Sequence, residues 1–373
     1  MWEPMFSGMM TGISTTMIPV NIAMVLFGCF SGSLIGMLPG LGPITAVALM
    51  IPITYGLEPT TGMVLLSGVY YGAIFGGSTS SILINAPGEA ATVATALDGY
   101  PLARQGHAGK ALAIAAYSSF SGGTIAVVLL MFFAPMLASV ATSFQSADYF
   151  ALMILGLTAV SAFAGRGGVL KALLMVVFGL MLSTVGTDQT SGVQRFTFGS
   201  LELLDGIEFL LLAMATFALT EALMIVLKRD ASSDSLDTKT IGFKSLKVTR
   251  KEFKLITPTI LRSSLLGFFV GVLPGAGATL GSFMSYGMER NLAPKEEQEK
   301  FGKGSLRGLA APETGNNAAS SGSFVPLLTL GIPGSGTTAV MLGALIAYGI
   351  EPGPRMFIER PDVFWGVIMS MYL

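Results

Sequence analysis

One motif occurs twice in this chain and interrupts hydrophobic sequence each time. The pattern Gly-x-x-x-Gly-x-Leu-Pro-Gly-x-Gly spans residues 32–42 and returns 235 positions later at residues 267–277. Proline removes a backbone donor and clashes with the preceding helical turn, and glycine accepts backbone angles that other residues avoid. A duplicated helix break inside hydrophobic sequence is typical of secondary transporters built from two repeats.

A second pair of breaks supports the duplication. Asn85-Ala-Pro-Gly88 is followed by Thr92, and Gly331-Ile-Pro-Gly334 is followed by Thr338, at an offset of 246 residues. The second half is therefore longer between its two breaks than the first, and the basic loop 289–307 accommodates the difference. We interpret each half as one repeat with two broken helices.

Composition places the chain in the membrane. It is 52% hydrophobic and 12% charged, with a mean hydropathy of +0.70, whereas soluble domains carry about 25% charged residues. We therefore predict an all-α integral membrane protein that crosses the bilayer several times. The expected spans between the repeats are 112–133, 150–163, 172–185 and 207–227.

Basic residues predict the topology, because Lys and Arg mark cytoplasmic loops. Residues 228–254 hold eight basic and four acidic residues, and residues 289–307 hold five basic ones, so we place both segments inside the cell. Residues 256–288 then begin and end on the same side, which favours a re-entrant hairpin with 273–277 near its tip over two short spans. The loop 56–62 has no basic residue and is expected outside, so the repeats have opposite orientation.

These observations predict four regions. Residues 1–111 form a first repeat with two helix breaks, 112–227 form scaffold helices, 228–255 form a cytoplasmic linker, and 256–373 form the second repeat. We expect the chain to end within a membrane segment, because the apolar residues 363–373 are too short to span the bilayer.

The breaks are candidate binding sites. Free N–H groups and helix dipoles at broken helices suit an anion, and unwound carbonyls suit a cation such as sodium. The predicted substrate-binding residues are Gly40, Leu41, Gly42, Ser78, Thr79, Asn85, Gly88, Gly275, Ala276, Gly277, Gly334, Ser335 and Thr337. The alternative for the glycines before each proline is close helix packing, since they form small-xxx-small stripes.

The coupling ion is predicted to be sodium, with the proton as the alternative. Asn316 and Asn317 offer hard oxygen ligands, and we assign them to the coupling cation. Glu89 and Glu313 lie beside breaks and are the acids available to carry a proton.

Signals of enzymatic activity are absent from the sequence. A single histidine, His107, makes a histidine-based metal cluster implausible, and the chain has no G-x-S-x-G motif. The segment 302–305 lacks the upstream glycine of a phosphate-binding loop. We therefore expect neither an enzyme nor a bound cofactor.

Several long stretches resemble the large membrane subunit of the tripartite tricarboxylate transporters. These stretches are 36–43, 70–79, 85–89, 96–106, 311–318 and 328–334, whereas 144–254 is less diagnostic. The resemblance implies a cation-coupled importer of di- or tricarboxylates in the bacterial inner membrane. It also implies a small membrane subunit and a periplasmic substrate-binding protein as partners, and no nucleic acid.

Two other functions stay open on sequence grounds. The same site without coupling would make a carboxylate anion channel, and a chain without a site would be a non-transporting membrane scaffold. For a transporter, analogy with other hairpin transporters suggests that the repeats slide against the scaffold helices as an elevator.

Overall fold

The computed structural model is built almost entirely from helices. It describes residues 2–141, 169–187, 193–204 and 242–373, together with single residues elsewhere in 143–227. The expected spans 150–163 and 207–227 and the linker residues 228–241 fall largely or wholly outside the described residues. The all-α prediction is confirmed, and the chain is an all-α membrane protein.

The first half holds six α-helices. They are α1 (Trp2–Thr16), α2 (Pro19–Gly36), α3 (Pro43–Thr54), α4 (Pro59–Ile84), α5 (Val93–Leu102) and α6 (Ala108–Ala141), with a short 3-10 turn η1 (Ala90–Thr92) and a π turn η2 (Ala103–His107) on either side of α5. The expected span 112–133 lies inside α6.

The described middle region is small. It contains α8 (Val169–Leu182), the antiparallel pair β1 (Gly186–Thr187) and β2 (Gln194–Arg195), and the 3-10 turn η3 (Leu201–Leu203). In the pair, Gly186 lies opposite Arg195 and Thr187 opposite Gln194. The expected span 172–185 coincides with α8 except for its last residues.

The second half repeats the pattern of the first. It holds η6 (Phe243–Leu246), α11 (Arg250–Val272), α12 (Gly277–Leu292), α13 (Lys295–Gln298), α14 (Leu306–Gly322), α15 (Phe324–Leu330), α16 (Gly336–Ala347), α17 (Met356–Glu359) and α18 (Pro361–Ser370). The helix pair α11–α12 corresponds to α2–α3, and α14–α15 followed by α16 corresponds to α4 followed by η1 and α5.

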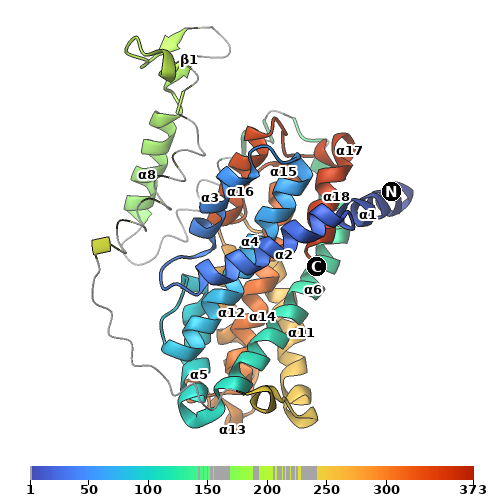
Figure 1. The fold of residues 1–373 in the computed structure, drawn as a ribbon, viewed down its shortest axis with the longest axis vertical. Helices are drawn as coiled ribbons and strands as arrows, with labels where there is room; N and C mark the ends of the chain where they lie inside the picture. The colour runs from blue at the N-terminus through green and yellow to red at the C-terminus, as the bar shows by residue number, and fades with distance from the viewer. Residues whose placement is uncertain are drawn as a thin grey trace.

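The two hairpins point in opposite directions. In Figure 1, α12 leads down to α13 at the lower end of the molecule, whereas α3 lies toward the upper end beside α16. The second helix of each hairpin packs on the other repeat, since α3 contacts α16 and α12 contacts η1. This exchange is the arrangement that a two-fold axis between inverted repeats produces.

Glycines set how closely the helices of each repeat approach. A Cβ at Gly36 would lie 2.1 Å from the Ala73 carbonyl oxygen, and a Cβ at Gly271 would lie 2.1 Å from the Ala319 carbonyl oxygen. Gly36 and Gly271 are related by the offset of the first breaks, and Ala73 and Ala319 by that of the second. The packing of α2 on α4 is therefore repeated by α11 on α14, so the glycines before each proline serve helix packing.

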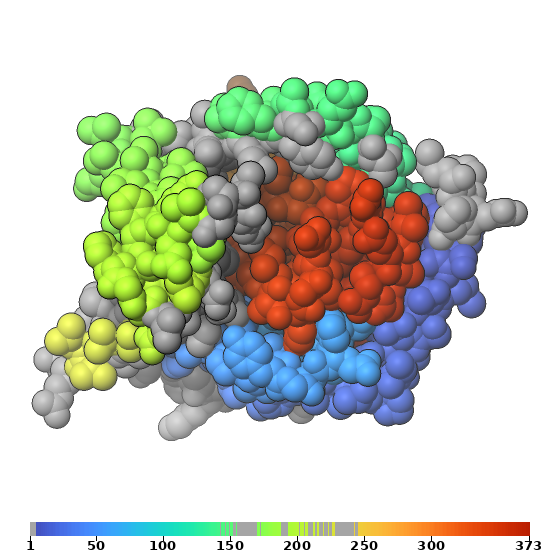
Figure 2. All heavy atoms as spheres, turned by 90° about the horizontal axis from the view of Figure 1, so that it is seen from above, coloured from blue at the N-terminus to red at the C-terminus, as the bar shows by residue number. Residues whose placement is uncertain are grey.

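The interior is unusually polar around α14. Every residue from Gly308 to Gly322 is buried. The polar members of this stretch are Glu313, Thr314, Asn316, Asn317, Ser320 and Ser321. The main apolar core lies to one end of it, over α3, α4, α15, α16 and α18. Figure 2 shows this end, with the red C-terminal residues lying between the blue N-terminal elements and the green end of α6.

The outer helices suit lipid. Large apolar side chains such as Phe30 on α2, Phe120 on α6 and Met175 on α8 are exposed. By length and composition, three helical stretches of the described residues could cross a membrane, namely Pro19–Gly36, Ala90–Ala141 and Arg250–Val272.

Candidate functional site

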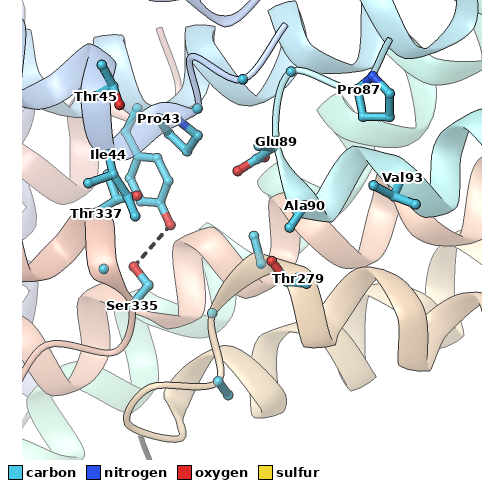
Figure 3. Close-up of a pocket in the computed structure, with 18 of the residues that line it drawn as sticks. Pro43, Ile44, Thr45, Pro87, Glu89, Ala90, Val93, Thr279, Ser335 and Thr337 are labelled. Atoms are coloured by element: carbon cyan, nitrogen blue, oxygen red, sulfur yellow. Dashed lines mark hydrogen bonds between the residues drawn. The ribbon is translucent and has the colours of Figure 1, made fainter. Parts of the chain in front are cut away.

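Residues at or directly after each of the four helix breaks line one cavity. Its volume is about 700 Å³, which falls within the range of small-molecule sites. The lining residues are Gly40, Gly42, Pro43, Ile44, Thr45, Tyr70, Pro87, Gly88, Glu89, Ala90, Val93, Gly275, Ala276, Gly277, Ala278, Thr279, Ser335, Gly336 and Thr337. Figure 3 shows these residues converging from both repeats on one open space.

The two Pro-Gly tips share the turn that follows the proline, whereas the last glycines of the motif differ, with φ −71° at Gly42 and +59° at Gly277. Leu41 N donates to the Leu38 carbonyl, and Ala276 N donates to the Leu273 carbonyl, so a tight turn follows each break. Gly40 has φ +85° and Gly275 has φ +79°, the left-handed region that favours glycine. The duplicated glycine is therefore required by the turn itself.

The second breaks of the two repeats also share one backbone arrangement. Asn85 and Gly331 end α4 and α15 in left-handed conformations, with φ of 52° and 67°. The chain then extends through Glu89 or Ser335 before the next helix begins. Thr92 and Thr338 close equivalent turns, because each hydroxyl donates to the carbonyl three residues earlier at 3.0 Å.

The first turns of four helical segments line the cavity. They belong to α3 (from Pro43), η1 (from Ala90), α12 (from Gly277) and α16 (from Gly336). The N–H groups in the first turn of a helix have no acceptor within that helix, and the dipole favours negative charge there. The cavity thus gathers several partial positive charges from the backbone.

Charged side chains are scarce at this cavity. Among the described residues that line it, none is Lys, Arg or His, and Glu89 is the acidic one. The Glu89 side chain points into the cavity, facing the wall where the Tyr70 hydroxyl lies 3.4 Å from Ser335 Oγ (Figure 3).

Eight predicted substrate residues reach the cavity. They are Gly40, Gly42, Gly88, Gly275, Ala276, Gly277, Ser335 and Thr337. The structure thereby brings together the glycine tips of both repeats, which lie far apart in the sequence.

The other predicted substrate residues lie elsewhere. Leu41 is buried, and the hydroxyls of Ser78 and Thr79 donate at 3.2 Å to carbonyls one turn earlier in α4. Asn85 is exposed. Gly334 packs against Ser323, where a Cβ would lie 2.7 Å from Cα.

The predicted cation ligands, Asn316 and Asn317, are buried in α14. Asn317 Nδ2 donates to Asn316 Oδ1 at 2.7 Å and to the Glu313 carbonyl at 3.0 Å. Asn317 lines a second cavity of about 300 Å³, which also contacts Cys29, Tyr71 and Ser119. Neither asparagine lines the first cavity.

Glu313 lies on α14, one turn before Asn317. Its Oε1 accepts a hydrogen bond from Thr95 and its Oε2 accepts one from Ser119 at 2.8 Å. No described cationic side chain forms a salt bridge with it. A fully buried carboxylate held by hydroxyls alone is costly in a membrane and by default marks function.

Sequence reasoning missed three polar residues of the cavity, Tyr70, Thr45 and Thr279. Thr45 and Thr279 lie in the first turn after each Pro-Gly tip. Their hydroxyls could therefore have been assigned to the site from their position in the sequence. Tyr70 lies mid-way along α4, far from any break, and only the tertiary fold brings it to the cavity.

Comparison with known proteins shows the family. The model of the tripartite tricarboxylate transporter TctA family matches residues 22–373. The chain belongs to this family. Its membership makes the chain the large subunit of a tripartite tricarboxylate transporter, and the family is one of transport proteins.

Relatives of this TctA chain occur in Agrobacterium vitis. An uncharacterized 52.8 kDa protein in the TAR-I ttuC' 3' region is 46% identical over 369 residues, which cover 99% of this chain and 72% of that protein. An uncharacterized protein in the TAR-II ttuC' 3' region is 49% identical over 107 residues, covering 29% of this chain and 43% of that protein. No solved structure matches the chain.

Proposed function

We propose that this chain imports di- or tricarboxylates across the bacterial inner membrane by cation symport. The observation that carries the proposal is that the first turns of several helices meet at one cavity with no Lys, Arg or His among its described lining residues. Oriented N–H groups bind carboxylates without fixed cationic side chains, and this suits a site that must release its substrate.

The proposal includes partners that fit the tripartite family. A small membrane subunit completes the membrane complex, and a periplasmic binding protein delivers the carboxylate. The chain crosses the membrane several times. The coupling ion is sodium, because the residues around the breaks offer hydroxyl, amide and carbonyl oxygens, which are hard ligands.

The close packing of α6 on α14 favours a moving unit that contains both helices. A Cβ at Gly122 of α6 would lie 2.6 Å from the Thr314 carbonyl oxygen of α14. A slide of the repeats against a scaffold would therefore carry α6 with the repeats, and the scaffold would begin after it.

Uptake into proteoliposomes that contain the chain and its partner subunits tests the proposal. We expect accumulation of citrate or succinate that requires an inward sodium gradient, and counterflow of labelled substrate against unlabelled substrate. Flux without accumulation or counterflow would identify a channel, and the absence of flux and of carboxylate binding would identify a scaffold.

A further inference from the structure

The acidic side chain of Glu89 lies within the cavity. Glu89 contributes a carboxylate, and among the described lining residues no cationic side chain opposes it. Glu89 Oε1 is buried and has no hydrogen-bond partner among the residues that the structure describes. A di- or tricarboxylate in the same cavity would add further negative charge beside this group, and backbone N–H groups offer only fractional charge in return.

Unlike Ser335 at the equivalent turn of the second repeat, Glu89 does not cap its helix with its side chain. There, Ser335 Oγ accepts a hydrogen bond from Thr338 N at 3.2 Å and so caps α16. At the first-repeat turn, Thr92 N donates to the Glu89 backbone carbonyl at 3.2 Å. The Glu89 carboxylate extends into the cavity instead (Figure 3).

No charged group on the described neighbouring elements pairs with Glu89. Glu313 on α14 adds repulsion, and α4 carries no charged residue. Asp98 on α5 accepts from the backbone N–H groups of Gly302, Gly304 and Ser305. Glu289 on α12 pairs with the arginines at 262 and 307.

We propose that Glu89 is a ligand of the coupling cation, and that one sodium ion binds in the cavity between this carboxylate and a carboxylate of the substrate. This inference rests on the proposed function and assigns the cation to the substrate cavity, whereas Asn316 and Asn317 lie outside it. Thr279 supplies a hydroxyl oxygen on the same side of the cavity (Figure 3). The ion shared by both carboxylates makes sodium and substrate bind cooperatively, and this cooperativity is reciprocal.

Thermal unfolding of the purified chain in detergent tests the sodium site without any transport. A ligand that binds the folded state raises the unfolding temperature as its concentration rises. We expect NaCl, compared with choline chloride at equal ionic strength, to stabilise the parent protein. Glu89→Gln should need about tenfold more sodium, or more, for the same shift. Glu58→Gln, at an exposed loop position, is the matched control and should behave as the parent.

The variant itself should fold. Glu89→Gln removes a charge from an unpaired buried oxygen, so its unfolding temperature in choline chloride should equal or exceed that of the parent. Sodium stabilisation of Glu89→Gln at the parent's concentrations would overturn the proposal. Failure of sodium to stabilise the parent, or a shift with pH that needs Glu89 but no sodium, would overturn it as well.

A second measurement separates this inference from the proposed function. Cys29→Ser removes the single cysteine, and Val93→Cys then places a reactive group on the cavity wall. Citrate or succinate should slow maleimide labelling at residue 93, and sodium should lower the carboxylate concentration required. Protection that is independent of sodium would leave the carboxylate site standing and refute the sodium ligand. A lack of protection under all conditions would refute the carboxylate site itself.

Discussion

Gly42 is the position where a new side chain enters the cavity without straining the backbone. Its φ is −71°, an angle open to any residue, and a Cβ there would lie 3.3 Å from the Glu89 Cβ. Gly40 and Gly275 also line the cavity, but their positive φ adds strain to any substitution. A substitution at Gly42 therefore tests the effect of an added charge without the effect of a strained backbone.

Gly42→Asp should abolish carboxylate uptake. A second carboxylate within a few Å of a bound anion costs on the order of 4 kcal/mol at an effective dielectric constant of about 20, roughly a thousandfold in binding. Gly42→Ala should be much milder, because it adds volume without charge. Uptake and carboxylate protection of the cysteine at residue 93 measure both variants.

The control for Gly42→Asp is a glycine-to-aspartate substitution at a position with open space for a side chain. Gly287 lies in α12, and a Cβ added there would have no atom of the described residues within 4 Å, so Gly287→Asp should retain uptake. Normal uptake by a well-folded Gly42→Asp protein would show that this cavity does not bind the substrate.

At the scale of elements, one carboxylate ties the start of α14 to α5. Asp98 is fully buried, and its Oδ1 accepts from the N–H groups of Gly302, Gly304 and Ser305 at 2.9, 2.9 and 2.7 Å. Its Oδ2 accepts from the Tyr286 hydroxyl at 3.0 Å. This contact joins the first repeat to the basic loop of the second.

Asp98→Asn should loosen this junction. Hydrogen bonds to a charged group contribute about 1.5–3 kcal/mol each. The neutral amide keeps one acceptor oxygen for the loop N–H groups, but it loses the charge and replaces the acceptor of the Tyr286 hydroxyl with an NH2 group. We expect a lower unfolding temperature and faster hydrogen exchange at residues 302–305. Glu297→Gln, in a partly exposed ion pair with Lys300, should change neither. Unchanged exchange in Asp98→Asn would show that the loop is held by other contacts.

At the scale of the whole molecule, the inverted arrangement predicts which surfaces face each side of the membrane. The loop before α4 and the loop around α13 lie toward opposite ends in Figure 1. In a Cys29→Ser background, Glu58→Cys should label from outside intact cells and Glu296→Cys should label only after permeabilisation. Both positions are exposed. External labelling of both cysteines would contradict the inverted topology.

The sequence predicted the parts of the site that depend on local backbone chemistry. The tips at Gly40 and Gly275 and the breaks at Asn85 and Gly331 follow from proline and glycine, whose effects act within a few residues. Tyr70 and the Asp98 junction could not be predicted, because both depend on segments that meet only after the repeats pack. Ser78 and Thr79 were assigned to the site for their proximity in sequence, but their hydroxyls face their own helix.

The buried polar helix α14 has a consequence for how this protein is made. A segment with Glu313, Asn316 and Asn317 at its centre is poorly suited to enter lipid alone, because each such group lacks partners there. Its partners lie on α5 and α6, which are synthesised earlier. We expect the isolated α14 segment to fail a glycosylation-based insertion assay and to insert when residues 90–141 precede it. Membrane insertion would then be ordered, because the early helices supply the hydrogen-bond partners that the central polar helix needs within the bilayer.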